Sequence, residues 1–198
     1  MTNYIAIIGL ATGVSILAAD ACPELDGANL QTQLEYLQRE RQTLMPACVS
    51  RAMSDLSLRA SQKTFDRHAE AIKTLAEYLD YRMPDERSKY LRAASSNRDP
   101  YPASSALFNI GKAAVPYLIE SIASASTSDT SKRNAVQTLS AIYREDPPEA
   151  VRVLRRASRS SEDWGSSQRL LEAARRASVC SGALEIACRD ALYEPDSR

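Results

Sequence analysis

Apolar residues recur along most of this chain at intervals of three and four positions, the spacing that places side chains on one face of an α-helix. No segment of useful length alternates apolar and polar residues, as a half-buried β-strand would. The pattern therefore predicts an all-α fold. In the first half, the positions expected to face inward are Leu30, Leu34, Leu37 and Leu44, then Cys48, Val49, Ala52, Met53 and Leu56, then Phe65, Ala69, Ile72, Leu75, Ala76 and Leu79.

Prolines mark where several of these helices begin and end. Pro46 opens the second helix, since proline is tolerated in the first turn, and Met83-Pro84 ends the third. A short helix is expected over 85–95. The segment 97–102 contains two prolines and is the clearest internal boundary of the chain.

After this boundary the helical pattern becomes more regular. Gly111 ends the first helix, Pro116 lies in the first turn of the second, and Ser128 can cap the third. The predicted helices cover 103–110, 113–124, 129–144, 147–158, 166–178 and 183–193. Their inward-facing positions are Val115, Leu118, Ile119, Ile122, Ala135, Val136, Leu139, Ile142, Val151, Leu154, Leu170, Leu171, Ala174, Leu184, Ala187 and Leu192. These helices form three successive pairs.

The second helices of the three pairs share their apolar spacing. Val115 corresponds to Val151 at an offset of 36, and Val151 corresponds to Leu184 at an offset of 33. A repeat of this length indicates stacked two-helix units, each of which buries its apolar face only against its neighbours. The alternative is an irregular bundle of short helices.

One stretch of the second half resembles a known repeat family. The residues Ala106-Leu107-Phe108-Asn109-Ile110-Gly111 end one predicted helix, and Ala114-Val115-Pro116-Tyr117-Leu118-Ile119 begin the next. This arrangement, over 106–122, is similar to one HEAT-like repeat. The resemblance implies a short α-solenoid over 103–194 that binds other proteins, preceded by an N-terminal helical region over 22–97. The family has no shared catalytic residues.

The N-terminus has the layout of a secretory signal. Sixteen residues from Tyr4 to Ala19 carry no charge, and Ala19-Asp20-Ala21 places small residues where a signal peptidase cleaves. We therefore predict a signal peptide over 1–21 and a periplasmic or secreted protein without stable membrane insertion after cleavage. The alternatives are an uncleaved membrane anchor, a lipoprotein attached through Cys22, and an ordinary buried helix.

Four cysteines lie at or beyond the predicted cleavage site, and in an exported chain an even number favours disulfides. They can pair in three ways. The predicted turn at Gly182 favours a local bridge between Cys180 and Cys188, which would leave Cys22 with Cys48, although the spacing does not fix the connectivity. That second pair requires the segment 23–29 to fold back along the helix that follows it. No metal site is predicted, because the chain has no CxxC and one histidine.

Charge and motifs exclude several functions. The chain contains 25 Lys and Arg against 25 Asp and Glu, so no basic excess argues for nucleic acid. His68 lies beside a buried stripe without a nucleophile motif, and no phosphate-binding loop occurs. A small exported hydrolase of cell-wall material is the alternative function, with Glu77, Glu120 and Glu172 as candidate carboxylates. We predict no catalytic residue and no cofactor.

Arginines crowd the helix predicted at 147–158. The spacing places Arg152, Arg156 and Arg159 on one face of this helix. This face lies opposite Val151 and Leu154. A tryptophan follows in the next loop, and Arg175-Arg176 lie on the next helix. The predicted binding residues are Arg152, Arg155, Arg156, Arg159 and Trp164. They predict a non-catalytic binding or scaffold protein with an acidic protein partner. Alternatively, nearby Asp and Glu residues pair with these arginines on a solvated face.

Overall fold

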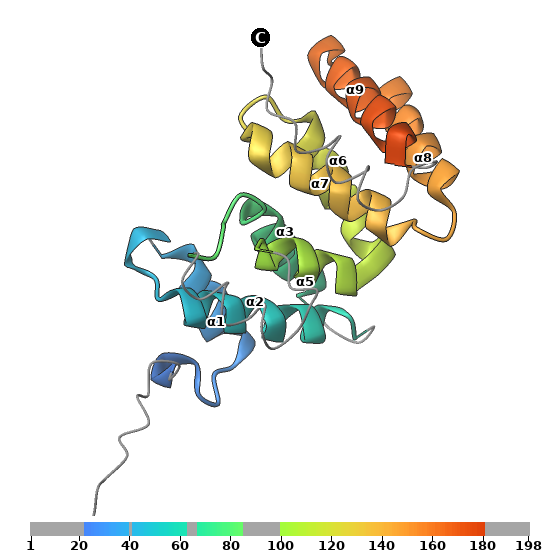
Figure 1. Ribbon diagram of the computed structural model, residues 1–198. Helices are drawn as coiled ribbons and strands as arrows, with labels where there is room; N and C mark the ends of the chain where they lie inside the picture. Colours follow the sequence, from blue (N-terminus) through green and yellow to red (C-terminus); the bar gives the residue numbers. More distant parts are fainter. Residues whose placement is uncertain (1–21, 40, 63–66, 85–99, 181–198) are drawn as a thin grey trace, which may run out of the picture.

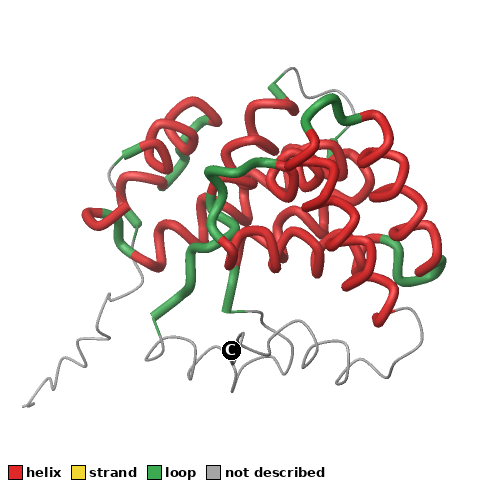
Figure 2. Tube along the Cα trace, turned by 90° about the horizontal axis from the view of Figure 1, so that it is seen from above, coloured by secondary structure: helices red, strands yellow, loops and turns green. Residues whose placement is uncertain are grey.

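The computed structural model describes residues 22–39, 41–62, 67–84 and 100–180 of the 198-residue chain. Within these ranges every regular element is a helix, which confirms the predicted all-α fold (Figures 1 and 2). The α-helices are α1 (Leu30–Gln38), α2 (Pro46–Ala60), α3 (His68–Glu77), α5 (Pro102–Ile110), α6 (Val115–Ala123), α7 (Asp129–Ile142), α8 (Pro147–Ser160) and α9 (Trp164–Cys180). The predicted segments 1–21, 85–95 and 183–193 lie outside the described residues.

A disulfide closes the N-terminal part of the fold. Cys22 and Cys48 are bonded, with their Cα atoms 5.4 Å apart and both residues buried. The chain turns back at Gly27, whose φ of 67° is readily adopted by glycine. The pairing reached by elimination in the sequence is therefore confirmed. The Cys180 side chain and Cys188 lie outside the described residues, so that pairing stays a prediction.

The first predicted helix is shorter than its apolar stripe. The stripe runs from Leu30 to Leu44, but α1 ends at Gln38 and is followed by a short 3₁₀ turn, Arg41–Thr43. The Tyr36 hydroxyl accepts a hydrogen bond from the Met45 backbone amide at 3.1 Å and so holds this turn against α1.

Local sequence signals define most of the other helix ends. Pro46 begins α2, Gly111 ends α5 with a φ of 75°, and the Ser128 side chain caps α7 by accepting from the Ser131 amide at 3.1 Å. The sequence predicts each of these three helix ends. No helix in the described part of the chain is long and apolar enough to cross a membrane.

One hydrophobic core extends from Cys22 to Ala177. Helix α5 packs on α2, α3 and α7, and α3 also packs on α6, so the regions 22–97 and 103–194 share this core (Figure 1). Most predicted inward positions are buried. Five differ, because they lie at the margins of the buried helix faces: Ala69 is exposed, and Leu30, Ile119, Ile142 and Leu171 are half-buried. Phe65 lies outside the described residues.

The second of the three predicted helix pairs is not a close pair, and the third includes 183–193, which lies outside the described residues. Helix α8 packs chiefly on α9, while its contact with α7 is slight, and α9 also packs on α6 and α7 (Figure 1). The short connection 161–163 makes α8 and α9 a hairpin, and its second helix fills the space against α6. The stacking of HEAT-like units stays a prediction.

Candidate functional site

The predicted arginine face lies on α8. Val151 and Leu154 are buried toward α9 and the core, while the arginines point to the opposite side. All four of them, Arg152, Arg155, Arg156 and Arg159, are exposed. The sequence therefore placed these side chains correctly on the outer surface of this helix.

Neighbouring acids neutralise only one of these arginines. Arg152 pairs with Asp146 at 3.0 Å and with Glu149 at 2.6 Å, and the Glu149 hydrogen bond raises the pKa of the guanidinium. Within the described part of the chain, Arg155 and Arg156 form no ion pair. Positive charge without a carboxylate partner is therefore left on the middle of this face.

Trp164 lies at the start of α9, directly after the connection from α8. Its side chain is 77 % exposed, the largest exposed fraction among the exposed large hydrophobic residues described. Arg175 and Arg176, predicted to extend the basic surface, both pair with Glu172 instead, at 3.5 and 3.1 Å. Of the arginines considered for this surface, those without an ion pair among the described residues are thus on α8, close in sequence to Trp164.

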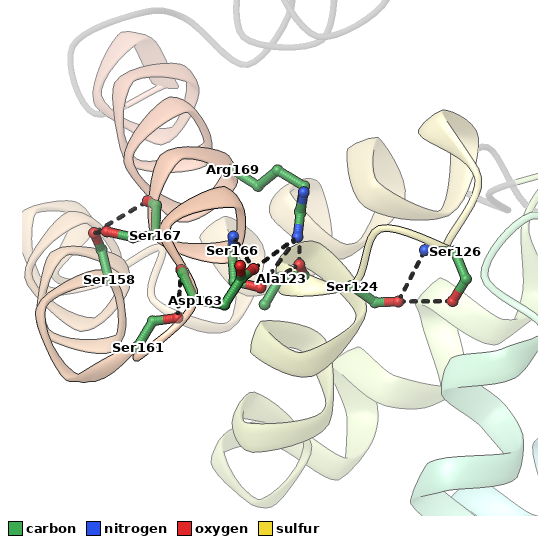
Figure 3. A network of polar contacts seen from close by, with 9 residues as sticks. All are labelled: Ala123, Ser124, Ser126, Ser158, Ser161, Asp163, Ser166, Ser167 and Arg169. Carbon is green, nitrogen blue, oxygen red and sulfur yellow. Dashed lines mark hydrogen bonds and ion pairs between the residues drawn. The ribbon is translucent and has the colours of Figure 1, made fainter.

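A polar network that sequence reasoning missed fixes the turn between α8 and α9 (Figure 3). Arg169 donates from Nε to the Ala123 carbonyl at 2.6 Å, and the Ser166 hydroxyl donates to the same oxygen at 3.0 Å. Asp163 accepts from the Ser166 amide at 2.6 Å and lies 3.4 Å from Arg169. These contacts attach the beginning of α9 to the carbonyl end of α6. The two hydrogen bonds to Ala123 join residues more than forty positions apart, and no local sequence pattern predicts them.

We expect Asp163 to make this turn sensitive to acid. Hydrogen bonds from the side chain and backbone of Ser166 lower the pKa of the Asp163 carboxyl. The stabilisation is therefore complete above the unfolded-state pKa, about 3.9, and is lost as the pH falls through the lower folded-state pKa. Asp163→Asn keeps a capping oxygen that does not titrate, so its melting temperature should fall less steeply below about pH 4 than that of the wild type.

The matched control for this pH series is Asp129→Asn, which changes an exposed carboxylate outside the network. Thermal melts followed by circular dichroism between neutral and acidic pH measure both variants. Equal slopes for the wild type and Asp163→Asn would show that this carboxylate does not contribute to the acid sensitivity.

A second feature is an open groove between α3 and the α6–α7 connection. Its volume is about 470 Å³. Its lining is mainly polar and consists of Arg41, Lys73, Ala76, Glu77, Asp80, Tyr117, Glu120, Ser121, Ser124, Ser126, Thr127, Ser128 and Ser131. None of the predicted arginines lines it. Two of the three carboxylates considered for hydrolysis, Glu77 and Glu120, do, whereas Glu172 lies on α9 and pairs with arginines.

Asp80 ties together three elements at one wall of this groove. It pairs with Arg41 at 2.8 Å and accepts from the Ser128 hydroxyl at 3.1 Å. Arg41 also donates to the Glu77 backbone carbonyl and lies over the Tyr78 ring, 4.4 Å from its centroid. Burial raises the pKa of Tyr78, whose hydroxyl donates to the Leu37 carbonyl. This wall is therefore held by polar contacts before any ligand arrives.

Other polar groups of the groove have no partner in the described ranges. They are the Lys73 amine, the Glu77 and Glu120 carboxylates, and the Tyr117 and Thr127 hydroxyls. His68, the histidine considered for catalysis, is half-buried and does not line the groove. The sequence signal for this groove is the group of serines and threonines at 121–131. From the sequence alone, this group predicts only the helix cap at Ser128.

Comparison with known proteins adds no relative: no protein family, curated protein or solved structure matches this chain.

Proposed function

We propose that this protein is a non-catalytic binding module that recognises an acidic surface of another protein through α8 and Trp164. The observation that carries the proposal is the pair Arg155 and Arg156, exposed and without a carboxylate partner among the described residues, on the helix that leads to the exposed Trp164. Arginine and tryptophan are the residues that most often dominate binding energy at interfaces. Uncompensated positive charge selects a partner of opposite charge.

The proposal includes export to the periplasm or the cell exterior. Two observations support it, the apolar N-terminal segment over 1–21 and the disulfide between Cys22 and Cys48. Disulfides persist mainly in oxidising compartments. The resemblance of 106–122 to a HEAT-like repeat supports a scaffold or binding role in the same way.

The alternative of a small hydrolase receives less support from the groove. Glycoside hydrolysis needs a carboxylic acid that its surroundings keep protonated, commonly by burial. Glu77 and Glu120 are both exposed in an open groove rather than enclosed in a deep pocket. Binding without chemistry is the function that this arrangement supports better.

The test uses Trp164, which is the single tryptophan of the chain and therefore an intrinsic fluorescent reporter of the proposed surface. We expect a short Asp/Glu peptide to change this fluorescence, with an affinity that falls as salt increases. Arg155→Glu combined with Arg156→Glu should weaken binding about tenfold or more, because two unpaired charges are reversed.

Arg175→Glu combined with Arg176→Glu is the matched control, since it changes net charge equally on α9, where the arginines pair with Glu172. This variant should bind like the wild type. The proposal is wrong if the acidic peptide leaves the fluorescence of the wild type unchanged, or if both double variants lose binding equally.

A further inference from the structure

We propose that the groove between α3 and the α6–α7 connection binds a short oligosaccharide that carries a protonated amine. This inference goes beyond the proposed function and uses different residues, none of which lies on α8. The groove volume of about 470 Å³ falls within the range of ligand pockets, roughly 300–1,000 Å³.

The groove offers hydrogen-bonding groups rather than an apolar anchor site. By residue type, only Ala76 and Tyr117 among the lining residues are apolar or aromatic, whereas a pocket for a protein hot spot is built mainly from such side chains. The stems of the long polar side chains also line the groove, so a fitting ligand carries many hydrogen-bonding groups beside some apolar surface. Short saccharides meet this requirement, because nearly every ring carbon carries a hydroxyl that both donates and accepts.

The partnerless side chains supply the complementary donors and acceptors. The Glu77 and Glu120 carboxylates accept, the Lys73 ammonium donates, and the Tyr117 and Thr127 hydroxyls do both. They come from α3, from α6 and from the connection that follows α6, so they face one ligand from different sides. A single charged side chain of a partner would leave most of them unused.

Charge selects among saccharides. Arg41 and Asp80 neutralise each other at 2.8 Å. The remaining charges are the Lys73 ammonium and the two carboxylates of Glu77 and Glu120, which leaves one negative charge in excess. An amine-bearing sugar balances that charge, whereas a uronate adds to it.

The walls of the groove are already ordered. Asp80 holds the wall that includes Arg41 and Ser128, and Ser124 and Ser126 bond to each other at 2.9 Å (Figure 3). Ser124 directly follows Ala123, the residue to which Arg169 and Ser166 donate. Because these wall residues are fixed before binding, the ordering cost is limited to the partnerless side chains that contact the ligand.

The test titrates the full chain with three trisaccharides and measures heat by calorimetry. The probes are a glucosamine trisaccharide, its N-acetylated form and a galacturonate trisaccharide. We expect the glucosamine trisaccharide to bind most tightly and the galacturonate most weakly. Glu120→Gln and Glu77→Gln should each weaken glucosamine binding about tenfold, the effect of losing one charge-assisted hydrogen bond.

Thr127→Val removes a hydroxyl without changing charge and should weaken all binding trisaccharides, while Glu172→Gln, outside the groove, should change none. Glu77, Glu120 and Glu172 are exposed and Thr127 is half-buried, and surface positions tolerate substitution; thermal melts confirm that the variants are folded. The proposal is overturned if the glucosamine trisaccharide does not bind, if galacturonate binds more tightly, or if both glutamine variants at Glu77 and Glu120 bind like the wild type. The α8 variants Arg155→Glu and Arg156→Glu leave this binding unchanged, so the two proposals fail separately.

Discussion

Replacing Cys22 and Cys48 together by alanine is expected to lower the free energy of unfolding by roughly 3–4 kcal/mol. The disulfide closes a loop with a sequence separation of 26, and in the chain-entropy account a loop of that length restricts the unfolded state by this amount. Both residues are buried, so alanine avoids placing new polar atoms in the core. The loss is a large share of the 5–15 kcal/mol typical of a folded domain.

Chemical denaturation of the oxidised wild type and the double variant measures this difference. The wild type in reductant is the second comparison, because it opens disulfides without changing the sequence. If the double variant unfolds at the same denaturant concentration as the oxidised wild type, the Cys22–Cys48 bridge does not stabilise the fold.

Leu107→Ala is expected to cost about 2–5 kcal/mol, the range found for leucine truncations in cores. Leu107 has no exposed surface and lies on α5, the helix that packs on α2, α3 and α7. Truncation therefore leaves a cavity where the N-terminal and C-terminal helices meet. Because both halves share this core, unfolding should stay a single transition at a lower temperature.

The matched control is Leu58→Ala, the same chemical change on a side chain of α2 that is 66 % exposed. We expect its effect to be within about 0.5 kcal/mol, as for most surface substitutions. Denaturant unfolding followed by circular dichroism compares the two. Similar losses for Leu58→Ala and Leu107→Ala would contradict the central position assigned to α5.

Helix positions and inward faces could be predicted because their causes are local. Pro46, Gly111 and Ser128 act on the backbone within one turn of their own positions. Each of these helix ends can therefore be predicted from the sequence without knowledge of the tertiary structure. The apolar spacing of α2 identified its buried face for the same reason. Even the pairing of Arg152 with Asp146 and Glu149 follows from residues a few positions away.

Packing partners could not be predicted in the same way. The apolar stripe of α8 does not identify the helix that it packs against. The sequence pattern pairs α8 with α7, whereas α9 is its main neighbour among the described helices. The early end of α1 is another case: the Tyr36 hydroxyl holds the turn after the helix through the Met45 amide, and the apolar stripe from Leu30 to Leu44 does not show this contact. An apolar helix face does not specify which neighbour it packs against. Which helices become neighbours is decided only when the whole core is packed.

The sequence by itself determined an all-α protein, the ends of most of its helices, and the outward arginine face of α8. Only the tertiary structure decided which arginines lack a partner and which distant residues line one groove. Lys73 on α3 and Tyr117 on α6 are far apart in the chain and line one groove because α3 packs on α6, and Arg41 joins them through its contacts with Glu77 and Asp80. Local backbone preferences act within a few residues, whereas a binding site forms between elements that the chain brings together only when it folds.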